Sequence, residues 1–369
     1  MKFVTKKDWG ITLSTVGDIL LVMGPVLLIP GLASMFYEVS YAIFFIAPGL
    51  LCSLFGYGLR KKFRSESIMH TKHTMLAAAL VWIIIPFLGT IPFIANGFSF
   101  IDSYFESISG FTTTGMTLMQ NIESYPEPLL LFRSFMQWIG GVGIIVLFLL
   151  ILTRPGASGY LYHSETRSDR IKPSMRGTAV EIWKIYGFYT FACVIFLLIA
   201  GMPLFEAINH SMTTIATGGL STKDASIGAY NDLVFVKPVI ILFMIIGAIS
   251  FFIHFRILDG DFKAIVRSEE FKFMIGIGVV ATLLITARIS LEENLSGGIG
   301  EMRDILFQVF AMITSTGFTT MDITTWDPFT QIILLILMVM GGCYGSTTGG
   351  LKMLWVLILW KTLWKRIKK

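Results

Sequence analysis

Charged side chains are scarce in this 369-residue chain. Asp, Glu, Lys and Arg together make up 14% of the residues, whereas soluble domains carry about 25%. Hydrophobic residues make up 54%, and the mean hydropathy is +0.73. One soluble core cannot bury that much apolar surface. The composition therefore argues against a soluble domain and predicts that lipid is the main solvent.

Cysteine is also rare. The three cysteines, Cys52, Cys193 and Cys343, lie inside apolar runs, are odd in number and have no ligand spacing. We therefore expect neither a disulfide framework nor a zinc site. The sequence shows no constellation of catalytic side chains, which predicts that the protein is not an enzyme and carries no covalently bound cofactor.

A cleavable leader pattern is missing at the start, because "MKFVTKKDWG" runs directly into an apolar stretch without small residues for cleavage. A membrane helix needs about 20 mostly apolar residues. Eight candidate spans meet this requirement: 11–35, 41–59, 75–94, 129–153, 182–202, 234–255, 273–289 and 329–360. The last run is long, and "GGCYGSTTGG" interrupts it. The pattern predicts an all-α polytopic membrane protein.

The net charge of +5 could indicate a nucleic-acid partner, but the basic residues follow a membrane topology instead. Of the 29 Lys and Arg residues, 23 lie before the first span or beside the loops after the second, fourth, sixth and eighth spans. The positive-inside rule then places both termini in the cytoplasm. The opposite loops are relatively acidic, and we expect no nucleic acid.

Three segments repeat one pattern between spans on the acidic side: "FESISGFTTTGMT", "INHSMTTIATGGLS" and "FQVFAMITSTGFTT". They align without gaps when Gly115, Gly218 and Gly317 share a column. Polar residues then stand nine positions earlier, namely Glu106, Asn209 and Gln308. Glycines recur in each following span, at Gly140–Gly143, Gly247 and Gly341–Gly342. Each unit reads as span, short helix, hydroxyl–glycine loop and span.

Irregular backbone at membrane depth is tolerated only where protein shields it or where it lines a wet cavity. Rings of backbone carbonyls can replace the hydration shell of a cation, and glycine supplies the unusual backbone angles. The C-terminal end of each preceding re-entrant helix favours cations. Ordinary turns between helices are the alternative, but three copies in one topological position favour a cation pathway.

These strings, together with "QWIGGVGIIVL" and "GGCYGSTTGGLK", resemble the Trk/Ktr/HKT superfamily of potassium transporters, most closely its bacterial Trk membrane subunits. The likeness covers nearly the whole chain. It implies about eight spans and three re-entrant pore helices around a pseudo-symmetric pore. The implied parts are an N-terminal helix pair (1–70) and pore repeats at 71–175, 176–268 and 269–369.

The resemblance also implies the site residues. Potassium would be held by the filter residues Thr113, Thr114, Gly115, Ala216, Thr217, Gly218, Ser315, Thr316 and Gly317. In plant relatives a serine at the first-repeat glycine goes with sodium permeation, so Gly115 favours potassium. The implied gate comprises Gly341, Gly342, Gly345, Ser346, Thr347, Thr348, Gly349, Gly350 and Lys352. Lys352 either faces the bundle interior or anchors the helix at the interface.

The implied partners are K⁺, the bilayer, a second copy in a homodimer and a cytosolic nucleotide-binding (TrkA-type) regulatory subunit. The implied location is the bacterial cytoplasmic (inner) membrane. His70 and His73 lie in a basic loop, where we expect them to be solvated rather than metal-bound, and we expect His210 to be structural.

The superfamily has four repeats around one pore, and three occur in this sequence. Three explanations are open: a truncated or split transporter, a fourth repeat supplied by another polypeptide, or a degenerate relative that does not conduct. The expected function is potassium uptake by a channel-like transporter subunit. The alternative is a non-conducting scaffold or regulator with the same fold.

Overall fold

The computed structural model describes residues 5–37, 39–63, 70–143, 175–292 and 299–368. These residues form helices and loops, with no β-strand among them, so the predicted all-α class is confirmed. The chain divides into two compact units, and the boundary falls between Lys184 and Ile185. The short segments Thr113–Gly115 and Asn121–Glu123 belong to the second unit.

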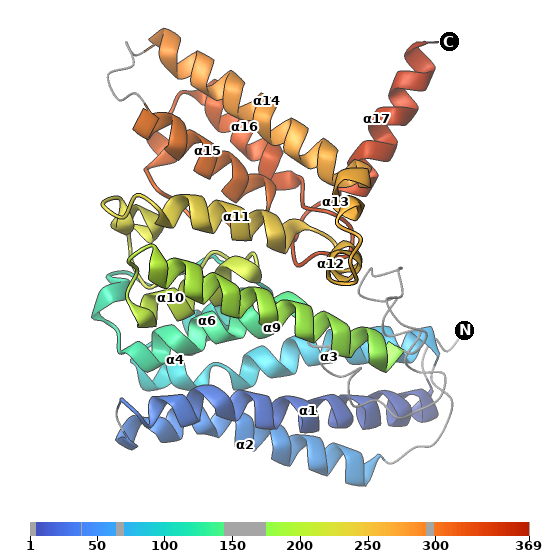
Figure 1. The fold of residues 1–369 in the computed structure, drawn as a ribbon. Coiled ribbons are helices and arrows are strands. Elements are labelled where there is room, and N and C mark those ends of the chain that lie inside the picture. The colour runs from blue at the N-terminus through green and yellow to red at the C-terminus, as the bar shows by residue number, and fades with distance from the viewer. Residues whose placement is uncertain (1–4, 38, 64–69, 144–174, 293–298, 369) are drawn as a thin grey trace. The chain divides into compact units, whose positions relative to one another are not determined.

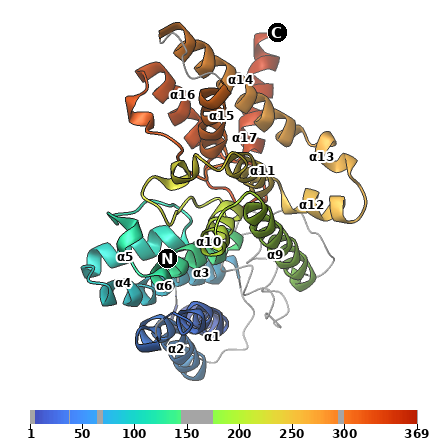
Figure 2. The ribbon, with the colours of Figure 1, turned by 60° about the vertical axis from the view of Figure 1, so that its left-hand side comes forward.

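The first unit is built from the N-terminal helices. They are α1 (Lys6–Ser34), α2 (Val39–Lys62), α3 (Thr71–Leu88), α4 (Ile91–Ala95), α5 (Phe100–Phe111), α6 (Glu127–Val142) and the start of α9 (Met175–Ile199). Figures 1 and 2 both show α1 and α2 side by side. A Cβ built on Gly24 would lie 2.9 Å from Gly49 O, and one on Gly56 would lie 2.9 Å from Gly17 O. Glycines thus let the two antiparallel backbones approach closely, as is common between helices in lipid.

The second unit holds the rest of α9 and the C-terminal helices. They are α10 (Leu204–Ile215), α11 (Val236–Ala248), α12 (Phe251–Leu258), α13 (Lys263–Arg267), α14 (Glu269–Glu292), α15 (Ile299–Ile313), α16 (Pro328–Val339) and α17 (Met353–Ile367). Three single 3₁₀ turns lie in the loops: η1 (Ile122–Ser124), η2 (Ser226–Tyr230) and η3 (Ile323–Thr325). Large apolar side chains such as Phe191, Leu283 and Leu335 are exposed along these helices, as expected for surfaces that face lipid.

Five described helices are long and apolar enough to cross a membrane: α1, α2, α3 with α4, α9 and α14. The predicted sixth span over 234–255 is not one straight helix, because α11 and α12 form a pair bent by 103°, either a broken span or a re-entrant loop. The predicted interruption of the last run is confirmed, since residues 340–352 separate α16 from α17. The fourth predicted span begins with α6, and its end (144–153) lies outside the described residues.

The N-terminal end of α1 is tied to α3 by a charged cluster. Asp8 completes a capping box with Thr5. Its Oδ1 lies 2.7 Å from both His73 Nε2 and Lys72 Nζ. His73 is 1% exposed, so the expectation of a solvated histidine is wrong at this position, where the carboxylate provides the polar partner.

Candidate functional site

Each of the three repeated segments folds as a short helix followed by a loop. The helices are α5, α10 and α15, and the hydroxyl–glycine loops that follow them are loop 1 (112–117), loop 2 (216–221) and loop 3 (314–319). Ser99 caps the start of α5 through its side chain, which accepts from Asp102 N, and Pro203 stands at the N-cap of α10. Residues Thr113–Gly115 share the second compact unit with loops 2 and 3.

The three loops share one unusual backbone pattern. A non-glycine residue with φ of 51° to 55° is followed two positions later by a glycine with φ of 75° to 80°. The pairs are Thr113 with Gly115, Thr217 with Gly219, and Ser315 with Gly317. Positive φ is uncommon outside glycine and is found where the surroundings impose it. Three identical pairs therefore show that the repeat in the sequence is a repeat in backbone structure.

This pattern corrects the alignment of the second copy by one residue. The glycine equivalent to Gly115 and Gly317 is Gly219, whereas the gapless alignment placed Gly218 there. Helix ends agree with the shift, because Ala216 is the cap residue after α10, as Thr112 is after α5. The segment equivalent to Thr113–Gly115 is therefore 217–219, and Gly219 was missing from the predicted filter residues.

The amide groups of loops 2 and 3 turn back toward their helices. Gly218 N donates to Thr213 O over 2.9 Å, and Thr316 N donates to Ala311 O over the same distance. Gly317 N also donates to Ala311 O, at 3.0 Å. Backbone that alternates between left-handed and other conformations directs successive N–H groups to one side.

A buried polar side chain on each short helix bonds to loop 1, to loop 2 or, in the third copy, to the segment just after loop 3. Glu106 accepts from Thr117 Oγ1 at 2.7 Å, His210 Nε2 lies 2.9 Å from Ser221 Oγ, and Gln308 donates to Met321 O at 3.3 Å. Each stands nine residues before its left-handed glycine, so His210 replaces Asn209 in the corrected alignment. His210 Nδ1 must donate to Glu206 O, so Nε2 accepts from the serine. These contacts support a structural role for His210.

A buried ion pair backs loop 1. Arg133 and Glu106 are each 1% exposed, and Arg133 Nε lies 3.6 Å from Glu106 Oε2. Arg133 also donates to Thr117 Oγ1 at 3.0 Å. Removing one member of a buried pair leaves an uncompensated charge, which typically costs about 3–5 kcal/mol. The pair therefore holds α5, α6 and loop 1 in one arrangement.

Loops 2 and 3 contact each other directly. A Cβ built on Gly219 would lie 1.9 Å from Thr316 O, so only glycine fits this approach. Further along, Gly228 N donates to Thr319 O at 3.1 Å, and Thr319 N donates to Ser226 Oγ at 3.2 Å. Ile122 N, which follows loop 1, donates to the Asp224 carboxylate at 3.0 Å. Successive copies are thus linked through the segments that follow the helices.

Two of the glycines predicted in the following spans allow close packing behind the short helices. A Cβ on Gly140 would lie 2.0 Å from Phe111 O, and one on Gly247 would lie 3.0 Å from Ile215 O. Phe111 and Ile215 are the last residues of α5 and α10. These glycines therefore let a second helix approach the C-terminal ends of the short helices.

The segment between α16 and α17 forms a closed loop, which we call the interruption loop (340–352). Its neck is the bridge between Met340 and Leu351, where Gly341 N donates to Leu351 O at 2.8 Å. Inside, Thr348 Oγ1 lies 2.8 Å from Ser346 Oγ and accepts from Gly342 N at 2.9 Å. The glycines and hydroxyls predicted to form a gate therefore make one hydrogen-bonded lobe.

Lys352 belongs to this lobe. Its ammonium donates to Thr348 O, and it lies 3.2 Å from Thr348 Oγ1. Of the two open interpretations, these contacts favour a lysine directed at the loop over an interfacial anchor. The ammonium thus donates to a carbonyl oxygen of the lobe and adds a contact to the Thr348 hydroxyl, as expected for a charge directed at protein rather than lipid.

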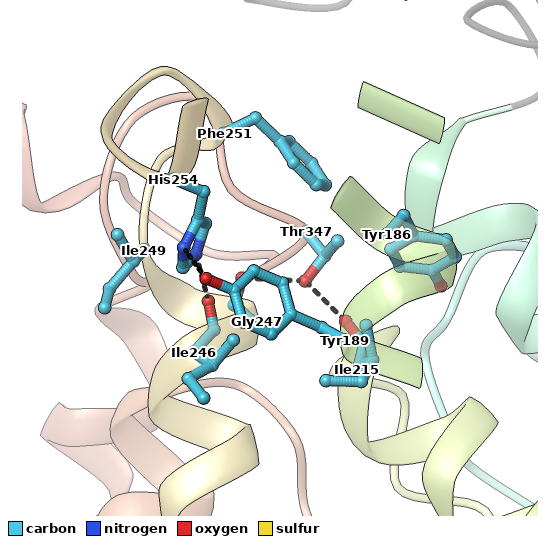
Figure 3. Close-up of a pocket in the computed structure, with 9 residues that line it drawn as sticks. All are labelled: Tyr186, Tyr189, Ile215, Ile246, Gly247, Ile249, Phe251, His254 and Thr347. Atoms are coloured by element: carbon cyan, nitrogen blue, oxygen red, sulfur yellow. Dashed lines mark hydrogen bonds between the residues drawn. The ribbon is translucent and has the colours of Figure 1, made fainter. Parts of the chain in front are cut away.

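The bend between α11 and α12 is braced by His254. Figure 3 shows dashed lines from its ring to Tyr189 and Ile246. Nε2 lies 2.9 Å from Ile246 O, and a carbonyl can only accept, so Nδ1 accepts from the Tyr189 hydroxyl at 3.1 Å. A small cavity of about 10 Å³ lies beside them, room for about one water. No group of three or more His, Cys, Asp or Glu side chains in the described part of the chain could hold a metal ion.

Sequence reasoning missed Gly219 and the bend at Ile249–Ser250. Two adjacent glycines make the register of the second copy ambiguous, and Ser250, a residue type favoured at helix starts, was the available signal for the bend. The predicted filter and gate residues lie in loops 1 to 3 and in the interruption loop. Their roles in ion binding and gating stay predictions.

Comparisons with known proteins agree with this architecture. The family model TrkH, described as a cation transport protein, matches residues 43–291 and 298–369. An uncharacterized cation transporter of Methanocaldococcus jannaschii is 39% identical, over 99% of this chain and 75% of the relative. The Trk system potassium uptake protein TrkH of Salmonella typhimurium is 34% identical, over 96% and 75%.

A solved structure is similar over nearly the whole chain. The crystal structure of the potassium transporter TrkH from Vibrio parahaemolyticus matches with a TM-score of 0.85 and 30% identity, over 98% of this chain and 76% of that one. The family consists of transporters, which confirms that the chain is not an enzyme. The chain belongs to the TrkH family of cation transport proteins.

Proposed function

We propose that the chain forms the potassium pathway of a Trk-type uptake system in a cytoplasmic membrane, with both termini in the cytoplasm. The observation that carries the proposal is the identical left-handed pair in loops 1, 2 and 3. The amides of loops 2 and 3 are bonded to their own helices, which leaves the carbonyls of these loops as the groups proposed to replace the water around a cation.

Two further features support a cation as the transported ion. The loops stand at the C-terminal ends of α5, α10 and α15, where helix dipoles place partial negative charge. Acidic side chains follow the loops, and the hydroxyl and amide of Thr324 lower the pKa of Asp322. That carboxylate stays ionised at neutral pH, and such charges raise the local cation concentration.

The names of the relatives support potassium as the cargo, since TrkH of Salmonella typhimurium is a potassium uptake protein. By the same family membership, we propose that the chain works as a homodimer with a cytosolic nucleotide-binding (TrkA-type) subunit. The interruption loop is the proposed gate, because it places a lobe of polar groups between two apolar helices.

The proposed filter is tested by selectivity measurements. Gly115→Ser and Gly317→Ser place a side chain where φ is 75° and 80°. We expect each variant to reduce the discrimination between potassium and sodium about tenfold or more, because the strained backbone can no longer hold the carbonyls. The measurement is rubidium and sodium uptake in a potassium-uptake-deficient host that carries the TrkA-type subunit and the chain extended by the C-terminal quarter of the Salmonella typhimurium relative, of which the chain covers 75%.

Unchanged discrimination in both variants, at equal amounts of membrane protein, would contradict the filter. A wild-type extended chain that inserts in the membrane yet supports no cation uptake would favour the alternative, a scaffold or regulator that keeps the fold.

A further inference from the structure

Two interrupted helices satisfy each other's backbone groups. α11 stops at Ala248, and the interruption loop separates α16 from α17. Helix ends leave carbonyls without partners, and lipid supplies none. Ala248 O accepts from Cys343 N at 2.8 Å, while Phe251 N donates to Gly345 O at 3.0 Å. The bend in one helix is therefore the docking place for the loop of the other.

The Thr347 hydroxyl connects the docked interruption loop to loop 2. Its Oγ1 lies 2.9 Å from Gly247 O and 3.0 Å from Ile215 O, the last residue of α10. It also lies 3.3 Å from Thr217 Oγ1, whose single proton is shared between Thr347 Oγ1 and the nearer Ala216 O at 2.7 Å. Figure 3 shows Thr347 pointing toward Ile215 and Gly247. Thr217 and Thr347 are 1% and 7% exposed, so the contact is shielded from solvent.

The other hydroxyls of the interruption loop behave differently. Ser346 donates to Cys343 O, and Thr348 bonds to Gly342 N and Lys352, so both act inside the lobe. In loop 3 the residue equivalent to Thr217 is Ser315, whose buried Oγ has no hydrogen-bond partner among the described residues. The hydrogen bonds of the described residues thus link the lobe, through Thr347, to the left-handed residue of the second copy and not to that of the third.

We propose that Thr347 is a positioning residue that couples the state of the interruption loop to the ion-binding backbone of loop 2. While the lobe is docked, the hydroxyl holds Ile215 O and Thr217 in the conformation with positive φ. When the lobe leaves, both lose a partner, and the carbonyls of loop 2 are free to turn away. This inference rests on the proposed filter and gate, and it adds a connection between the gate and one strand of the filter.

The test compares Thr347→Val, which keeps the shape and removes the hydroxyl, with Thr347→Ser, which restores it. The matched control is Thr282→Val in α14, whose buried hydroxyl bonds only to Gly278 O. Hydrogen exchange is followed in residues 340–351 and in residues 213–219, where Gly218 N is bonded to Thr213 O. The second measurement is the midpoint of thermal stabilisation by KCl.

We expect Thr347→Val to speed hydrogen exchange in both segments and to raise the KCl concentration at the midpoint of thermal stabilisation about tenfold. A factor of ten corresponds to the net contribution of about one hydrogen bond. Thr347→Ser should restore both readouts, and Thr282→Val should move neither. Faster exchange in 340–351 alone, with residues 213–219 and the midpoint unchanged, would overturn the coupling. A wild-type chain that KCl does not stabilise would contradict the proposed filter. Faster exchange of both segments in Thr347→Val would even then support the contact between Thr347 and loop 2.

Discussion

At the scale of single residues, the backbone pattern of loop 2 separates two neighbouring glycines. Gly219 has a φ of 77°, and its added Cβ would meet Thr316 O. Gly218 occupies the position held by Thr114 and Thr316 in the other copies. The structure therefore predicts that Gly218 tolerates a side chain better than Gly219, although the two residues look equivalent in the sequence.

We predict that Gly219→Thr removes potassium-dependent stabilisation, whereas Gly218→Thr largely retains it. The left-handed conformation costs a residue with a Cβ about 1–2 kcal/mol, and the contact with Thr316 O adds to this. The measurement is the shift in melting temperature between KCl and choline chloride. Equal losses in both variants would contradict the different roles assigned to the two glycines, and a larger loss in Gly218→Thr would favour the gapless alignment.

The residue scale also shows what the sequence can and cannot predict. The three loops and their chemical class follow from spacing, because the motif itself contains the glycines and hydroxyls. The register of "ATGG" does not follow from spacing, because Gly218 and Gly219 each fit the column of Gly115 and Gly317. The braces Glu106 and Gln308 were found by position, but His210 was placed one column away from its equivalents, and the backbone register of loop 2 and the contact with Ser221 identify it.

At the scale of helices, interruptions with a local cause were predictable and those with a distant cause were not. Glycines and hydroxyls between α16 and α17 break that helix in any surroundings. The bend after Ala248 is stabilised by Cys343 and Thr347, about 100 residues further along the chain. An apolar run such as 234–255 carries little trace of a partner so far away, so it reads as one straight span.

One helix start gives a prediction on pH. Asp327 caps α16 by accepting from Phe329 N and Thr330 N, and its Oδ1 lies 3.5 Å from Arg288 Nε. The Thr330 hydroxyl is the main cause that lowers the pKa of Asp327 below its ordinary value of 3.8. A lowered pKa contributes stability above the unfolded value, and this contribution is lost as the pH falls through the folded value.

We therefore expect Asp327→Ala to lower the melting temperature at pH 7 and the difference from wild type to shrink below about pH 4. Asp327→Asn should keep part of the stability at neutral pH, because asparagine also caps helices well. The measurement is thermal unfolding in detergent across this pH range. A difference that is constant from pH 7 to the acid range would contradict the ionised cap.

At the scale of the whole molecule, the number of loops matters more than any one of them. Loops 1 to 3 present the same left-handed pair, and the resemblance to the superfamily implies a fourth copy around the pore. The chain spans 75% of the length of its Methanocaldococcus and Salmonella relatives. Three carbonyl strands would leave one side of a cation incompletely coordinated, so we expect potassium uptake to require a fourth loop.

The prediction is that a chimera made of this chain followed by the C-terminal quarter of the Salmonella typhimurium relative restores growth of a potassium-uptake-deficient host, while the 369-residue chain alone does not. Gly219→Thr within the chimera is the control, because it should abolish uptake only if ions pass through loop 2. The TrkA-type subunit is supplied in every strain, so its absence cannot explain a difference. Uptake by the 369-residue chain alone would contradict the need for a fourth loop in the same polypeptide. A chimera that inserts but does not conduct would instead favour the scaffold, because the missing loop would no longer explain the loss of transport.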